Sequence, residues 1–202
     1  MALNANAVFT AAKGYVYVAD VADAVAPTPA EIKVFNAADG LGTGWRDVGH
    51  TSREELPEFG FDGGETETRG TWQNAALRTV VPEAAVDYVV VQLHQFDDEA
   101  LELYYGVPNA SEDPGQFSVA EASTQAPERA LCIVIEDGEN HMALYAPRVS
   151  AAREDSITMA VDEFAALPIR FTFLKRDPDQ DGTTYPLFTW INEDVLGQTV
   201  GS

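Results

Sequence analysis

The chain has 202 residues, 46% of them apolar, which is enough for one folded domain with a sizeable core. It carries 33 acidic and 12 basic residues, a formal net charge of −21, which argues against DNA binding through phosphate neutralisation. The sequence contains no run of about 18 apolar residues, which a membrane-spanning helix would need. The first nine residues lack the basic and apolar regions of a signal peptide, so we expect synthesis and folding in the cytoplasm.

The first half of the chain begins with small and polar residues and continues with several runs typical of strands. Residues 1–13 are expected to form an N-terminal arm. Runs rich in β-branched and aromatic residues, or alternating between charged residues and threonine, then predict strands. These strands are expected at residues 14–19, 31–35, 65–71, 77–81 and 87–96.

A short helix is predicted directly after the last of these strands, from Asp97 to Tyr105. Acidic residues occupy its first turn, where they suit the positive end of the helix dipole. Gly106 and Pro108 are typical of a helix end. We expect this to be the one accessory helix of the fold.

The second half of the chain starts with a long polar loop, residues 107–127, and then returns to strand patterns. The Asp137–Asn140 sequence predicts a hairpin turn between two of the strands. The strands are expected at residues 116–119, 131–136, 141–149, 156–161, 169–175 and 185–190. Many short strands without a βαβ pattern predict a single domain over residues 1–202, an all-β sandwich or barrel of antiparallel strands with one accessory α-helix.

The residues that usually carry enzyme chemistry form no recognisable pattern. The three histidines are widely separated, and no spacing is typical of a zinc site. Paired carboxylates are numerous, but adjacency is expected by chance in so acidic a chain, and no nucleophile motif is present. Cys132 lies in an apolar strand-like run and is expected to be buried. We therefore expect no catalytic residues and no cofactor.

One local pattern suggests a metal site. Asp177, Asp179 and Asp181 match the opening of a calcium-binding loop, which continues with a glycine at the next position. However, Phe188 stands where such a loop needs a bidentate glutamate. A turn of solvated acids is the favoured interpretation, and calcium binding is kept as the alternative.

Several short motifs in the first half of the chain together resemble the major tail tube proteins of long-tailed (siphovirus-type) bacteriophages, especially those of actinobacterial hosts. The opening residues 2–8 and 14–17 are similar to the start of that family. The other motifs are Trp45–Ser52, Glu54–Pro57, Gly63–Glu65, Gly70–Trp72, Leu77–Arg78, Gln95–Asp97 and Leu103–Gly106.

The resemblance implies two packed antiparallel sheets flanked by a helix, in a structural virion protein that is not an enzyme. It implies self-association into hexameric rings whose inner sheets join edge to edge, and stacking of the rings into a hollow tail tube. The partners implied are further copies of the chain, a tape-measure protein and the tail terminator and baseplate proteins. Location in the virion tail, after assembly in the host cytoplasm, is implied as well.

The charge suits such a tube, because double-stranded DNA that crosses it must not adhere to the wall. The acids expected to face the lumen lie on an amphipathic strand and at a hairpin tip. They are Glu65, Glu67, Glu136, Asp137 and Glu139. Solubility or adaptation to high salt would also account for the charge.

Two other functions remain open on the sequence. One is another virion assembly protein, such as a tail terminator or a head-decoration protein. The other is a small acidic enzyme or a calcium-binding β module, which the pattern at residues 177–182 would serve.

Overall fold

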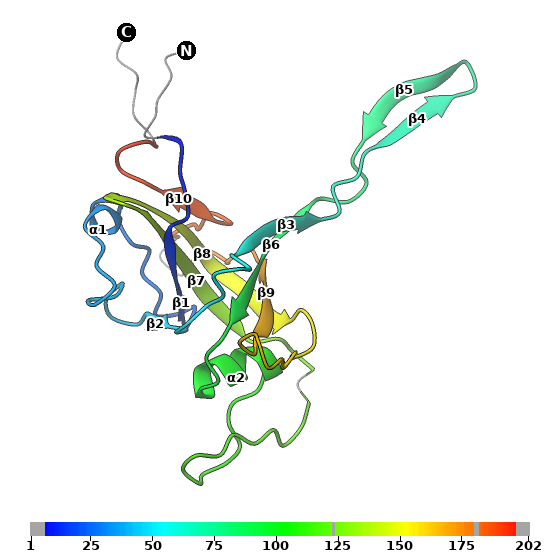
Figure 1. Cartoon of the computed structure of the whole chain (residues 1–202). Coiled ribbons are helices and arrows are strands. Elements are labelled where there is room, and N and C mark those ends of the chain that lie inside the picture. Colours follow the sequence, from blue (N-terminus) through cyan, green and yellow to red (C-terminus); the bar gives the residue numbers. More distant parts are fainter. Residues whose placement is uncertain (1–6, 123, 180–181, 197–202) are drawn as a thin grey trace.

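The computed structural model describes residues 7–122, 124–179 and 182–196, which contain ten strands and two helices (Figure 1). The helices are α1 (Pro29–Lys33) and α2 (Asp98–Tyr105). The strands are β1 (Lys13–Ala19), β2 (Arg46–Asp47), β3 (Glu58–Asp62), β4 (Glu67–Thr71), β5 (Asn74–Val80), β6 (Val86–Leu93), β7 (Glu128–Asp137), β8 (Asn140–Arg153), β9 (Leu167–Phe173) and β10 (Thr189–Ile191).

Eight strands form one antiparallel sheet, seven of them in the order β2-β1-β7-β8-β9-β6-β3 and the eighth, β10, paired with β8; β4 pairs with β5 in a separate two-stranded ribbon. The long strand β8 pairs with β10 through Ala143–Tyr145 and with β9 through Val149–Arg153. The predicted all-β antiparallel fold is therefore confirmed. The eight strands belong to one continuous sheet rather than to two separate ones.

The sheet closes on itself at one end through the segment that follows β2. While β2 pairs with β1, Thr51 forms a β-bridge to Leu93 at the end of β6. The backbone N–H of Ser52 donates to the carbonyl of Gln92 at 2.9 Å. This short segment thus joins the two sides of the sheet into a partial barrel.

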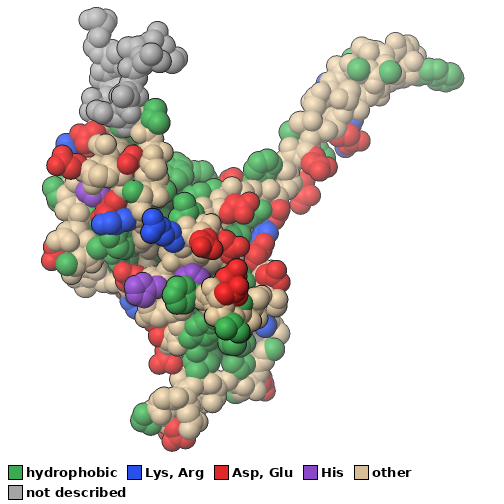
Figure 2. Space-filling model, viewed as in Figure 1, with side chains coloured by type: hydrophobic (Ala, Val, Ile, Leu, Met, Phe, Trp, Pro, Cys, Tyr) green, Lys and Arg blue, Asp and Glu red, His purple; other side chains and the backbone are tan. Residues whose placement is uncertain are grey.

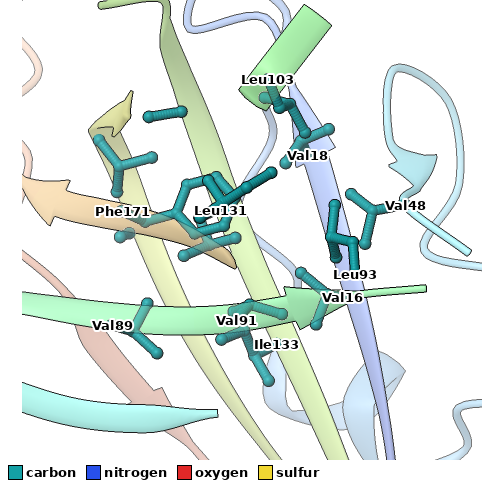
Figure 3. Close-up of a cluster of buried hydrophobic side chains, with 14 of the residues drawn as sticks. Val16, Val18, Val48, Val89, Val91, Leu93, Leu103, Leu131, Ile133 and Phe171 are labelled. Atoms are coloured by element: carbon teal, nitrogen blue, oxygen red, sulfur yellow. The ribbon is translucent and has the colours of Figure 1, made fainter. Parts of the chain in front are cut away.

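The inner face of this barrel holds the main core (Figure 3). Alternate residues of each strand point inward, as the two-residue period of a strand requires. Helix α2 packs against the same core through Ala100 and Leu103. Among the fully buried side chains of this core are Val16, Val18, Val89, Val91, Leu93, Leu131, Ile133 and Phe171.

The outer face of β1, β7 and β8 is buried too, because side chains from α1 and the segment around it pack on it. Ile32 and Phe35 contact a second core that includes Tyr17, Cys132 and Tyr145. Burial on both faces accounts for the unbroken apolar run of β7. The predicted burial of Cys132 is confirmed, and burial raises the pKa of its thiol and raises that of Tyr17 to about 12.

The predicted helix is confirmed, whereas the strand predicted at residues 31–35 is wrong. Asp97 caps α2 by accepting from the N–H of Ala100, and Gly106 ends it with a φ of 73°. Residues 29–33 form α1 instead of a strand, because Thr28 and Glu31 cap each other's backbone N–H groups. This reciprocal capping box fixes a helix start that the β-branched residues of the segment conceal.

Two further predicted strands, at residues 116–119 and 156–161, are absent from the structure. Residues 156–161 alternate as a strand should, but they have an isolated bridge from Thr158 to Ala166 rather than a partner strand. In the long loop, the side-chain oxygen of Asn109 accepts from the N–H of Ser118 at 2.9 Å. A side chain therefore satisfies that backbone group in place of a neighbouring strand.

Candidate functional site

The most prominent surface feature is a hairpin that projects from the body of the molecule (Figure 1). It comprises residues 63–85, with β4 and β5 as its two strands, and it is called the arm below. The residues of β4 and β5 are exposed except for half-buried Val80, and Trp72 at the tip is 100% exposed. An isolated two-stranded hairpin is marginally stable in water. The arm is therefore expected to gain stability by contacting another surface.

Charged contacts hold the root of the arm. The guanidinium of Arg170 on β9 donates to Asp62 at the end of β3 (2.6 Å) and to Glu154 (2.5 Å). The bond to Glu154, followed by that to Asp62, raises the pKa of Arg170 against the effect of burial. Immediately beyond Asp62, Gly63 and Gly64 have φ angles of 77° and 72°, which favour glycine, and the arm begins there.

Two edge strands flank the end of the barrel near the arm. In the described part of the chain β3 pairs with β6 alone, and β10 with β8 alone. Phe59 of β3 and Trp190 of β10 contact each other with ring centroids 5.4 Å apart, and both remain more than a third exposed. Unpaired strand edges of this kind are templates for pairing with another chain.

The five acids predicted to face a lumen fall into two groups on different elements. Glu65 and Glu67 lie on the arm, where Glu67 is ion-paired with Arg69 at 3.1 Å. Glu136, Asp137 and Glu139 lie at the β7–β8 turn, away from the arm in Figure 1. There the carboxylate of Glu136 lies 4.0 Å from the Nζ of Lys13 and 3.7 Å from the Nε2 of His141. The carboxylate of Asp137 accepts a hydrogen bond from the backbone N–H of Thr10.

The two described aspartates of the predicted calcium loop, Asp177 and Asp179, lie near basic or hydroxyl groups of other side chains. Asp179 accepts hydrogen bonds from Arg176 and from the hydroxyl of Tyr185, and Asp177 lies 3.9 Å from Arg148. Asp181 lies outside the described residues. Within the described ranges, no three His, Cys, Asp or Glu side chains come together in a way that could hold a metal ion.

A concave surface lies next to α2. It is an open depression lined by Tyr104, Tyr105 and residues 153–157. The guanidinium of Arg153 lies 5.8 Å and 5.7 Å from the two tyrosine ring centroids and packs against them. In the described part of the chain, neither helix is long and apolar enough to cross a membrane.

Comparison with known proteins decides between the remaining interpretations of these surfaces. The phage tail tube protein family matches residues 1–201. The chain belongs to this family. It is 48% identical over 205 residues to the major tail protein Gp23 of Mycobacterium phage D29, covering 100% of this chain and 98% of that protein. It is also 48% identical to the major tail protein Gp23 of Mycobacterium phage L5, covering 97% of this chain and 96% of that protein.

Membership of the tail tube family confirms the resemblance drawn from the first half of the sequence and extends it to the second half. A tail tube subunit assembles with further copies of itself. Both relatives are named major tail proteins.

Sequence reasoning found the strand of the arm but missed its importance. Trp72 belongs to the Gly70–Trp72 motif of the resemblance, and the structure places it wholly exposed at the tip of the arm. Arg78 was noted within a motif without a role, although it lies directly opposite Arg69 on the arm. The paired glycines at residues 63–64 were the available signal that the hairpin leaves the sheet there.

Proposed function

We propose that the chain is the major tail tube subunit of a long-tailed bacteriophage, and that it forms hexameric rings that stack into a hollow tube for DNA passage. Two findings together carry this proposal. The family match spans residues 1–201, and the same chain extends an arm with a fully exposed Trp72, a large apolar side chain that a contact with another copy would bury.

The edge strands support ring formation. A neighbouring copy that pairs with the free edge of β3 or β10 would satisfy backbone groups that face solvent in the single chain. It would also cover Phe59 and Trp190. A ring closed by rotation removes such edges without unlimited growth in the plane, and stacking then provides growth along the axis.

The net charge of −21 supports the passage of DNA without binding. Lysines and arginines on a lumen wall would release counterions from DNA and hold it, whereas carboxylates repel the phosphates. The proposed lumen acids remain Glu65, Glu67, Glu136, Asp137 and Glu139. Assembly in the host cytoplasm, and contacts with tape-measure, terminator and baseplate proteins, belong to the same proposal.

Negative-stain imaging and sedimentation of the purified full-length chain test the proposed function. The expected result is hollow tubes of uniform width that sediment rapidly and do not retain double-stranded DNA. A protein that stays monomeric or forms isolated trimers at every concentration would contradict the proposal.

A further inference from the structure

The outer part of the arm differs in charge from its root. Residues 67–80 contain two arginines and one glutamate, a net charge of +1, whereas the whole arm, residues 63–85, also contains Glu65 and Glu83 and has a net charge of −1. Arg69 and Arg78 are cross-strand partners, an arrangement that is unfavourable for like charges. Glu67 pairs with Arg69, and among the described residues no ion pair involves Arg78. The outer part of the arm therefore carries positive charge that an acidic partner surface would stabilise.

An acidic loop, opposite in charge to the outer part of the arm, directly precedes β9. Residues 154–166, called the acceptor loop below, contain four acids and no basic residue. The hydroxyl of Tyr104 donates to the carbonyl of Asp155 at 2.8 Å, and His94 contacts the carbonyl of Ala165 at 3.0 Å. Both ends of the acceptor loop are thus held against the body.

The middle of the acceptor loop is left exposed with an unusual combination of side chains. Met159, Val161 and Phe164 are 76%, 107% and 85% exposed. Asp162 and Glu163 lie between the last two of these, and within the described ranges neither forms an ion pair. Large apolar side chains next to unpaired acids are complementary to the arm, which presents a tryptophan next to arginines.

The arm and the acceptor loop lie at opposite ends of the same strand. The arm leads into β6 at Val86, whereas the acceptor loop leads into Leu167, which pairs with Leu93 at the other end of β6. Figure 1 shows the arm pointing away from the end that carries α2, and Figure 2 shows hydrophobic side chains at its tip. A contact between the arm of one copy and the acceptor loop of another is therefore head-to-tail, which produces open-ended growth where the rotation between copies does not close a ring.

We propose that the arm of one copy docks on the acceptor loop of a second copy, with Trp72 against Met159, Val161 and Phe164, and Arg78 paired with Asp162 and Glu163. This inference rests on the proposed function, and it names the surface that receives the arm during stacking. The exposed pair Phe59 and Trp190 is less suitable as a receiver, because it lies near the root of the arm.

Single cysteines test the contact directly, since the native Cys132 is buried. Gln73→Cys places a thiol at the tip of the arm without removing Trp72, and Ala160→Cys places one on the acceptor loop. Tagged and untagged variants are mixed, assembled and oxidised, and the linked pair is detected on a non-reducing gel. We expect the 73–160 pair to form about tenfold more readily than pairs of Gln73→Cys with Val25→Cys, since docking raises the effective concentration of the thiols.

Linkage of Gln73→Cys to Ala120→Cys in the long loop, or to Phe61→Cys on β3, in preference to Ala160→Cys would overturn the inference. If the wild-type chain forms tubes but the 73–160 pair does not form, the docking inference fails while the proposed function stands. If the wild-type chain forms neither tubes nor linked pairs, the proposed function fails and the inference fails with it.

A charge exchange provides an independent test. Arg78→Glu is expected to raise the concentration needed for sedimentable assemblies about tenfold, because like charges would then face each other at the contact. Combining it with Asp162→Arg and Glu163→Arg is expected to restore assembly. Arg53→Glu makes the same charge change at another exposed arginine and is expected to leave assembly unchanged. An equal effect of Arg53→Glu, or no rescue by the exchanged acids, would contradict the docking inference.

Discussion

The guanidinium of Arg170 lies over the ring of Tyr88, with its carbon 3.7 Å from the ring centroid. Tyr88 in turn lies over Gly60, where an added Cβ would be 2.5 Å from the ring carbon that carries the hydroxyl. Arg170, Tyr88 and Gly60 belong to β9, β6 and β3, so this stack ties together the three strands at the root of the arm.

Arg170→Ala is expected to loosen the root of the arm. The variant loses a cation–π contact and two partly exposed ion pairs, which together should lower the free energy of unfolding by about 1–2 kcal/mol. Urea denaturation gives the loss of stability, and hydrogen exchange should show faster exchange in β3. The free energy of unfolding of Arg170→Lys should lie between those of the wild type and Arg170→Ala, because lysine cannot make the same planar contacts. Unchanged exchange in β3 would show that Arg170 does not hold the root.

Gly60→Ala is expected to destabilise the fold by about 1–3 kcal/mol, because Tyr88 must move away from the new methyl group. Most of this cost should disappear in a Tyr88→Ala background, which a double-mutant cycle measures. Gly14→Ala is the matched control, since its added Cβ would have ordinary contact with the carbonyl of Val134 at 3.6 Å. Equal costs with and without Tyr88 would contradict the proposed clash.

Glu154→Gln should reduce stability in a pH-dependent way. The hydrogen bond from Arg170 lowers the pKa of Glu154 below its ordinary value of 4.5. The stabilisation by Glu154 is therefore complete above the ordinary value and is lost as the pH falls through the lowered pKa of the folded state.

Urea denaturation of Glu154→Gln and the wild type should consequently differ by up to about 1 kcal/mol at neutral pH, and the difference should vanish in acid. Glu163→Gln, which removes the charge of an exposed glutamate, is the control and should leave stability unchanged at neutral pH. A difference that persists at acid pH would show that the Glu154 carboxylate acts by packing rather than by charge.

Replacing Glu139 at the β7–β8 turn by lysine tests its proposed place in the lumen. If this residue faces the bore, Glu139→Lys tubes should retain double-stranded DNA at low salt and release it as salt increases. Co-sedimentation of tubes with DNA measures the retention. Glu112→Lys in the long loop makes the same charge change and serves as the control. Equal retention by both variants would place Glu139 outside the lumen.

The local features of the fold were predictable because their causes are local. The hairpin of β7 and β8 follows from two apolar runs and a turn at Asp137–Asn140, where Gly138 has a φ of 66°. Helix α2 follows from its cap at Asp97 and its end at Gly106. The start of α1 also has a local cause, the capping box of Thr28 and Glu31, but the β-branched residues that follow favour a strand by their own propensity.

The misplaced strands and the arm depend on relationships that a single sequence does not display. Residues 156–161 alternate as a strand does, but no neighbouring strand lies beside them, because β9 pairs with β6 and β8. Likewise, a tryptophan usually packs against other residues, whereas Trp72 is wholly exposed in the single chain. The resemblance to tail tube proteins supplied the function, since the physical patterns alone fit any acidic β protein.

Cryo-electron microscopy of assemblies formed by the purified chain would show both the ring and the arm contact in one measurement. We expect stacked rings of six subunits around an open channel, with carboxylates lining the channel and each arm seated on residues 154–166 of a subunit in the adjacent ring. A closed oligomer without a channel, or a channel lined by arginines and lysines, would contradict this expectation.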